Sequence, residues 1–156
     1  MAVTIAEVEY SAKTVAVAFS VTGESDILDA GTLRPVDEVS TEIDLDPDNP
    51  RMDVLAVARR QLSEQWKKMA GSLRLRHVQF PNEDNPRWRV SFAVGVRYRI
   101  NIAVPFEDMR EHFQRHGMDG VVEAGRSLAM ERVQGFAATV AQAQPYARLD
   151  PVSPSE

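Results

Sequence analysis

Eighteen consecutive residues, 87–104, alternate strictly between apolar and non-apolar side chains. The even-numbered positions, from Trp88 to Val104, hold aromatic or branched aliphatic residues, and the odd-numbered positions, from Arg87 to Ala103, are small, polar or cationic. Because successive side chains of a β-strand point to opposite faces, one face of this stretch is apolar and the other is polar. The pattern predicts a one-sided sheet as the organising element of the fold.

Gly95 lies near the middle of this stretch and leaves its backbone path open. A two-residue turn at Gly95 and Val96 would move the arginines that follow it onto the apolar face. A continuous strand that bends at Gly95, or a turn with an odd number of residues, keeps both faces consistent. We favour one long bent strand over residues 87–104.

The rest of the chain contains further strand and helix patterns. We predict strands over residues 3–10, 14–21, 39–45 and 73–80, and helices over 51–70, 105–116 and 119–143. Asn49 and Pro50 are typical of a helix start, and Gly71 and Gly117 of a helix end. We expect residues 22–37 to form a crossover loop.

These elements predict one α+β domain over residues 1–143. Its antiparallel sheet would have about five strands, including the long bent strand, with helices packed on one face. An extended and partly disordered C-terminal segment would follow over residues 144–156.

Charge is unevenly distributed along the chain. The net charge is -5, but residues 24–53 sum to -8 and residues 54–104 sum to +7. If Phe80 pairs with Arg87, one sheet face becomes basic through six arginines: Arg74, Arg76, Arg87, Arg89, Arg97 and Arg99. Single-stranded nucleic acid is bound by cations together with aromatic stacking platforms, but here the aromatic residues alternate onto the opposite face. Nucleic-acid binding is therefore the less favoured interpretation of the basic face.

No motif in the sequence supports catalysis, so we predict a non-enzymatic protein without cofactor or metal ion. The run Asp44, Asp46 and Asp48 lacks the glycine and the glutamate that complete a calcium loop. The helical set Asp108, His112 and His116 lacks a further zinc ligand. The chain has no cysteine and no apolar run of about 20 residues, which fits a cytoplasmic protein without a membrane span.

The C-terminal third resembles the SecB family of export chaperones, including the SecB-like chaperones of toxin–antitoxin systems. After its long helix the chain continues with a short extended segment at the family's spacing: Pro145, Ala147, Leu149, Pro151 and Val152. Residues 8–17 and 40–46 look like the family's first and second strands. The long strand with Gly95 resembles its last strand, which carries a glycine near its middle.

The resemblance implies an ATP-independent chaperone that holds unfolded or nascent polypeptides in apolar grooves beside exposed strand edges. It also implies a tetramer, built as a dimer of dimers. Six residues would line the peptide groove: Ile27, Leu28, Leu33, Tyr146, Leu149 and Val152. The alternative function is a structural subunit of a ring or a phage-like particle, which the opposite charge blocks favour. Both functions predict a homo-oligomer whose partners are proteins.

Overall fold

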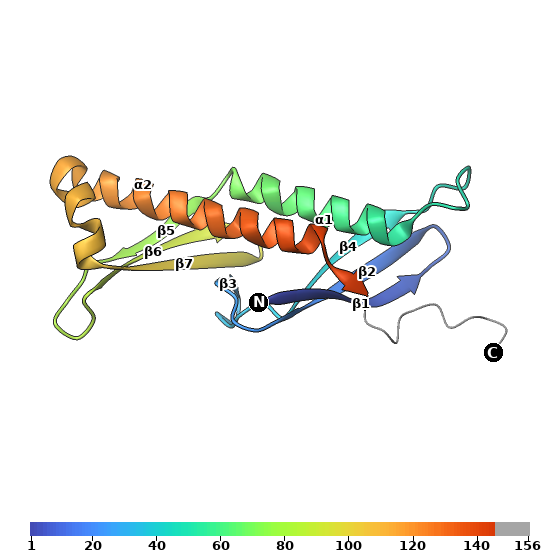
Figure 1. Cartoon of the computed structure of the whole chain (residues 1–156), viewed down its shortest axis with the longest axis horizontal. Helices are drawn as coiled ribbons and strands as arrows, with labels where there is room; N and C mark the ends of the chain where they lie inside the picture. The colour runs from blue at the N-terminus through green and yellow to red at the C-terminus, as the bar shows by residue number, and fades with distance from the viewer. Residues whose placement is uncertain (146–156) are drawn as a thin grey trace. The chain divides into compact units, whose positions relative to one another are not determined.

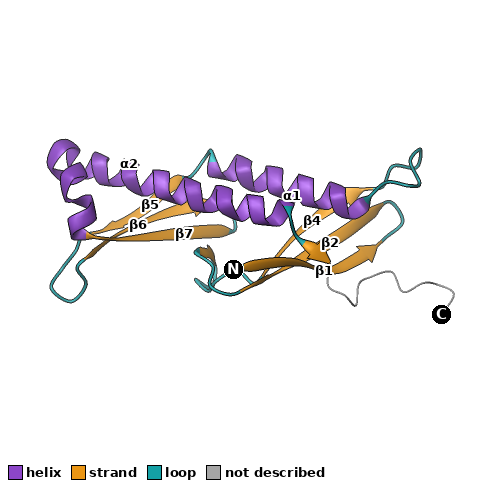
Figure 2. Ribbon diagram, in the orientation of Figure 1, coloured by secondary structure: helices purple, strands orange, loops and turns teal. Residues whose placement is uncertain are grey.

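The computed structural model describes residues 1–145. Within these residues the fold is α+β, as predicted, with two α-helices and two four-stranded sheets (Figures 1 and 2). The antiparallel strands are thus divided between two sheets instead of forming one. The described residues separate into a first unit of Met1–Ser25, Val36–Trp66 and residues 136–145, and a second unit of Asp26–Pro35 and Lys67–Gly135. The single domain over residues 1–143 stays a prediction.

Each unit contains three antiparallel strands in succession, followed in the chain by a helix. In the first unit these elements are β1 (Ala2–Tyr10), β2 (Thr14–Thr22), β4 (Glu38–Asp44) and α1 (Val54–Ala70). In the second they are β5 (Arg74–Gln79), β6 (Arg87–Val94), β7 (Tyr98–Pro105) and α2 (Phe106–Ala141). The fourth strand of each sheet comes from a distant segment. These strands are β8 (Gln144–Pro145), beside β1, and β3 (Ile27–Asp29), beside β7.

The first unit buries one face of its sheet, as the alternation of its strands predicts. Val17 and Phe19 of β2 are fully buried, and Ile43 of β4 is nearly so. Trp66 of α1 packs on Phe136 of α2 with their ring centroids 4.6 Å apart. The apolar residues of the three strands therefore form the core of this unit, and their polar neighbours face outward.

Helix α1 begins at Val54, so the predicted start at residue 51 is wrong. The carboxylate of Asp53 accepts a hydrogen bond of 3.1 Å from the backbone N–H of Ala56, which is the geometry of an N-cap. Asn49 instead belongs to a preceding turn, in which its N–H donates to the carbonyl oxygen of Asp46 at 3.1 Å. A capping side chain needs a free helical N–H two or three residues ahead of it in the chain. Asp53 has one at Ala56, whereas Asn49 lies in a turn before the helix.

Residues 87–104 form a β-hairpin, and the long bent strand that we favoured is wrong. Val94 pairs with Tyr98, so Gly95, Val96 and Arg97 form a three-residue turn. An odd loop length pairs even-numbered residues with even-numbered ones, as in Phe92 opposite Ile100. The apolar face is therefore preserved through the turn, which is why alternation alone did not separate a hairpin from a strand. The predicted loop 22–37 also differs, since it contains the short strand β3.

Strand β5 carries a β-bulge that adjusts its register against β6. Leu75 pairs with Phe92 but His77 pairs with Ser91, which leaves Arg76 as the extra residue. Before the bulge the register is the one we predict, and beyond it the strands shift by one residue, so that Gln79 pairs with Arg89.

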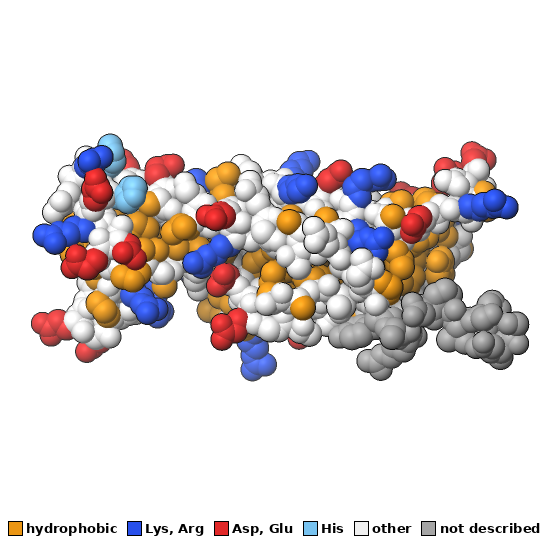
Figure 3. Space-filling view, viewed as in Figure 1, with side chains coloured by type: hydrophobic (Ala, Val, Ile, Leu, Met, Phe, Trp, Pro, Cys, Tyr) orange, Lys and Arg blue, Asp and Glu red, His pale blue; other side chains and the backbone are white. Residues whose placement is uncertain are grey.

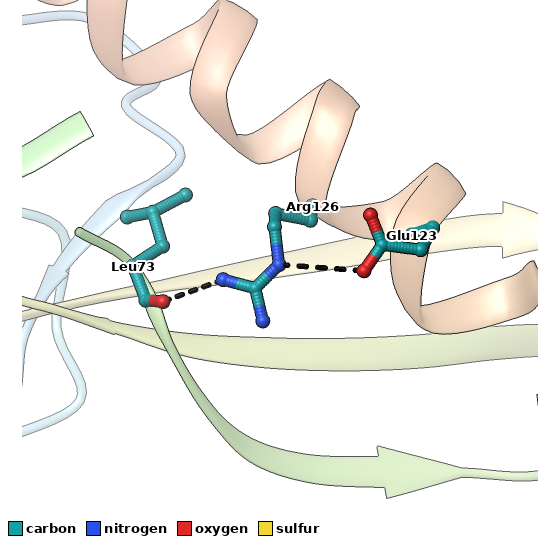
Figure 4. Close-up of polar contacts among 3 residues, drawn as sticks. All are labelled: Leu73, Glu123 and Arg126. Atoms are coloured by element: carbon teal, nitrogen blue, oxygen red, sulfur yellow. Dashed lines mark hydrogen bonds and ion pairs between the residues drawn. The ribbon is translucent and has the colours of Figure 1, made fainter. Parts of the chain in front are cut away.

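Helix α2 covers the apolar face of β5, β6 and β7 (Figure 2). A Cβ added to Gly125 would lie 3.1 Å from the Cβ of Val90, so glycine allows the helix to approach the sheet closely. The guanidinium of Arg126 lies 5.1 Å from the ring centroid of Phe92 and donates to the backbone carbonyl of Leu73, while Glu123 lies 3.9 Å from its Nε (Figure 4). These contacts fix the start of β5 against the helix.

The long helical segment is kinked where we predict a break. Gly117 has φ 62° and ψ -145°, which is not a helical conformation, and helices continue on both sides of it. Glycine is suited to this position because a positive φ is costly for residues with a side chain. The first part of α2, before the kink, lies against the start of β6, where the cluster described below is found.

Candidate functional site

Partly exposed aromatic side chains surround Trp88 at one end of the second sheet. The ring centroids of Phe80, Phe113 and Phe106 lie 4.9, 5.5 and 6.5 Å from that of Trp88. Trp88 is only 2% exposed, whereas Phe80 is 55%, Phe106 38% and Phe113 37% exposed. The indole N–H of Trp88 is buried without a hydrogen-bond partner among the described residues. An apolar cluster of this kind is typical of a contact surface for another polypeptide.

Strand β5 next to this cluster is an open edge of its sheet. The strand order is β3-β7-β6-β5, so within residues 1–145 no strand pairs with the outer side of β5. Leu75 is 44% exposed and pairs with the buried Phe92, so it lies on the apolar face of the sheet. Phe80 lies on the same face, because it is two residues after Val78, which pairs with the buried Val90. We call β5 together with Leu75, Phe80, Trp88, Phe106 and Phe113 the apolar edge. It offers unpaired backbone groups and apolar side chains side by side.

The opposite side of the second sheet is cationic. Four of the six arginines predicted to share a face occupy outward register positions there: Arg74, Arg87, Arg89 and Arg99, which we call the arginine face. Arg76 is the extra residue of the β5 bulge, and Arg97 is the last residue of the turn after β6. Trp88 and Phe92 lie on the other face, as we predict, whereas Tyr98 lines the cavity beside the arginines.

Three of these arginines converge on a small polar cavity. It has a volume of about 160 Å³ and is lined by Ala30, Arg74, Arg76, Ala93, Gly95, Val96, Tyr98 and Arg99. Arg74 donates a hydrogen bond of 3.0 Å to the carbonyl oxygen of Gly95. The Nε of Arg99 is buried and has no partner among the described residues. We call this cavity the arginine pocket.

Tyr98 lies at the wall of the arginine pocket, and its environment favours the neutral phenol. Burial raises the pKa of Tyr98, and the carboxylate of Asp29 adds to the increase, whereas the positive charge of Arg97 acts in the opposite direction. Desolvation is the largest of these effects, because a phenolate loses its hydration when buried.

Three of the six residues predicted to line a peptide groove lie within the described residues, and they differ in exposure. Ile27 is 2% exposed and pairs with Ile100 in the core of the second unit. Leu28 is half-buried opposite Arg99, and Leu33 is 54% exposed in a loop with φ 58°. The other three predicted residues, Tyr146, Leu149 and Val152, lie outside the described residues.

The apolar edge is not evident from the sequence. Its aromatic residues are far apart in the chain, and each has an ordinary local role at a strand end or on a helix. Only the pairing of β5 with β6 and the kink of α2 bring Phe80 and Phe113 to Trp88. The one available signal was Phe80, a large apolar residue directly before a polar turn.

The aspartate run of residues 44–48 and the histidines of α2 form no metal site within the described residues. Asp46 accepts a hydrogen bond of 2.9 Å from the N–H of Asp48 within a turn. His112 and His116 border a hollow of about 460 Å³ on α2, and Figure 3 shows histidine side chains in pale blue at the kinked end of this helix. Residues 1–145 contain no group of three or more potential ligand side chains that could hold a metal ion.

The chain was compared with families, curated proteins and solved structures. It matches no family model, no curated protein and no solved structure. The resemblance to the SecB family stays a prediction. Among residues 1–145, no helix combines the length and the apolar composition that a membrane span requires.

Proposed function

We propose that this protein is an ATP-independent chaperone of the cytoplasm that holds unfolded or nascent polypeptides in an extended form along β5. The observation that carries the proposal is the apolar edge, in which exposed aromatic side chains lie beside a strand whose outer side is unpaired within the described residues. The sequence resemblance to the SecB family supports the same class of function.

An extended client segment would gain two kinds of interaction at this edge. Its backbone would pair with the outer N–H and C=O groups of β5, which requires no particular sequence. Its alternate side chains would cover Leu75 and Phe80, which are 44% and 55% exposed. Each further 100 Å² of apolar surface removed from water contributes about 2.5 kcal/mol. This contribution must exceed the cost of ordering the client segment on the edge. The edge therefore suits unfolded chains, which expose both their backbone and their apolar residues.

The remaining side chains of the client would face the polar side of the sheet. Arg74, His77 and Gln79 occupy the outward positions of β5. Acidic client residues would be favoured there over basic ones. The proposed preference is thus for segments in which apolar residues alternate with polar or acidic residues.

The test is suppression of aggregation, without ATP, of a chemically denatured client at an equimolar ratio. We expect the wild-type protein to reduce light scattering and the Phe80→Asp variant to lose most of this effect. Val96→Asp is the matched control, because Val96 is 92% exposed in the β6–β7 turn and lies outside the apolar edge. Absence of suppression by the wild type, or equal loss in both variants, would overturn the proposal.

A second candidate function is that of an assembly subunit, and one observation favours it. The outward face of the first sheet carries exposed carboxylates among small residues: Glu7, Glu9, Glu38, Glu42 and Asp44. The arginine face of the second sheet has the opposite charge. The acidic face of one copy could pair with the arginine face of another, which is a head-to-tail contact between subunits.

Light scattering coupled to size exclusion tests this second function. We expect a mass above that of one chain in low salt, which decreases when salt is raised and in the double variant Arg87→Glu, Arg89→Glu. A monomer at high protein concentration in low salt would exclude it.

A further inference from the structure

We infer that the arginine pocket is a binding site for one oxyanion group, a carboxylate or a phosphate. This site goes beyond the proposed function, since it lies on the outward face of the sheet and involves none of the aromatic residues of the apolar edge.

The register of the sheet creates the site. Arg74 of β5, Ala93 of β6 and Arg99 of β7 occupy one row across three neighbouring strands, so two guanidinium groups lie on either side of a small residue. The bulge adds Arg76 to the lining of the same cavity, outside the regular ladder. The turn at Gly95 closes one side and accepts a hydrogen bond from Arg74, which orients that side chain. Bulges commonly redirect a side chain toward a functional position.

The three guanidinium groups of this pocket, which belong to Arg74, Arg76 and Arg99, form no direct ion pairs with carboxylates of the described residues. The nearby carboxylate of Asp29 is already engaged, because it accepts hydrogen bonds from the backbone N–H groups of Gly31 at 2.8 Å and Thr32 at 3.1 Å. Three guanidinium groups in one cavity repel one another, and an anion would convert this repulsion into attraction.

Arg99 lines the pocket, and its guanidinium is held with the Nε turned away from solvent, where it makes no hydrogen bond with the described residues. An anion in the cavity would therefore bind the terminal N–H groups of this guanidinium in charge-assisted hydrogen bonds. The planar guanidinium presents its donors in a fork that matches two oxygens of one carboxylate or phosphate group.

The volume limits what can enter. A cavity of about 160 Å³ accommodates one anionic group but is smaller than the roughly 300 Å³ or more of most small-molecule sites. The rest of any larger ligand must therefore remain outside the cavity. The assigned ligand is the anionic group itself, whether free or at the end of a longer molecule.

Titration calorimetry with inorganic phosphate and with acetate tests the inference, at constant ionic strength maintained with sodium chloride. We expect saturable binding of at least one anion at one site per chain, accompanied by a higher melting temperature. Binding should weaken at least tenfold in Arg76→Gln and in Arg99→Gln. It should be unchanged in Arg87→Gln, which removes an arginine of the same face that does not line the pocket.

The outcomes separate the possible sources of the anionic group. Binding of phosphate alone assigns a phosphate-bearing ligand, and binding of acetate as well assigns carboxylates. Arg76 is exposed, so Arg76→Gln should fold normally. If Arg99→Gln is unstable, the anion affinity of Arg76→Gln decides the test. No saturable binding of either anion into the millimolar range, or equal weakening in Arg87→Gln, would overturn the inference. Loss of aggregation suppression with anion binding intact would contradict the proposed function only.

Discussion

At the scale of single residues, Gly95 determines how the main hairpin closes. It has φ 60°, in the left-handed region, and begins the three-residue turn between β6 and β7. A Cβ at this position would lie 2.6 Å from the sulfur of Met69, whose flexible side chain could move. The backbone conformation is therefore the stronger constraint, since a β-branched residue rarely adopts it.

We predict that Gly95→Val lowers the free energy of unfolding by about 1–3 kcal/mol, the usual cost of holding such a residue at positive φ. Ala93→Val is the matched control, because it lies on the outward face of regular strand β6, where valine is favoured. Urea unfolding of both variants measures the difference. A Gly95→Val protein as stable as Ala93→Val would show that the turn does not require glycine.

Tyr98 gives a prediction about pH. Burial first, and then Asp29, raises the pKa of Tyr98, while Arg97 partly opposes them. The neutral phenol therefore contributes stability that is fully present below the unfolded value of about 10 and is lost as pH rises through the higher folded value. In a titration of tyrosinate absorbance, Tyr98→Phe should remove the ionisation that occurs at the highest pH. The variant should also lose less of its free energy of unfolding when the pH is raised above about 10. An unchanged titration above pH 10 would contradict this assignment.

At the scale of elements, the kink of α2 depends on close backbone contact. Gly120 follows the kink, and a Cβ there would overlap the carbonyl oxygen of His112 and lie 2.8 Å from the Cβ of His116. The backbone before the kink could not move away without changing the path of the helix. The kink in turn positions Phe113 against Trp88, so helix geometry and the apolar edge are linked.

We predict that Gly120→Ala destabilises the protein, although alanine is the better helix former. Gly135→Ala in the same helix is the control, because nothing lies within 4 Å of the added Cβ. This control should be more stable by about 0.5–1 kcal/mol through helix propensity alone. Thermal melts followed by circular dichroism compare the two. Stabilisation by both substitutions would mean that the kink tolerates a side chain at residue 120.

At the scale of the whole molecule, each unit contains one tryptophan. Trp66 is in the first unit and Trp88 in the second, and both are buried. Besides the crossings at residues 25–26 and 35–36, the chain passes from one unit to the other within α1, after Trp66, and within α2, after Gly135. Separate unfolding of one unit would require both helices to end at these points, which interrupts their cooperative hydrogen bonding.

We therefore predict that the two units unfold together. In urea, the fluorescence of Trp88→Phe reports on the first unit and that of Trp66→Phe on the second. Each transition should coincide with the loss of circular dichroism in the same variant. A fluorescence transition that is displaced from the dichroism transition in either variant would show two independent domains.

Much of the local structure was predictable, because it depends on side-chain periodicity. The prediction of which residues of β6 and β7 share a face was correct, although the predicted connection between them was not. An odd-length turn and a continuous strand both keep the even-numbered residues on one face. The break at Gly117 was predictable because glycine followed a helical pattern. The start of α1 was not, because Asn49 and Asp53 are both good capping residues and only the backbone path selects between them.

The sequence by itself determined the two faces of the longer strands and the approximate ranges of most elements, because alternation and helical spacing act between neighbours in the chain. Only the tertiary structure decided that the strands form two sheets, that β3 and β8 complete them, and that β5 is an open edge. It also decided that Arg74 and Arg99 share a row and that Phe80 and Phe113 meet at Trp88. Strand pairing depends on the free energy of contacts between distant segments, and a local pattern does not specify which segments those are.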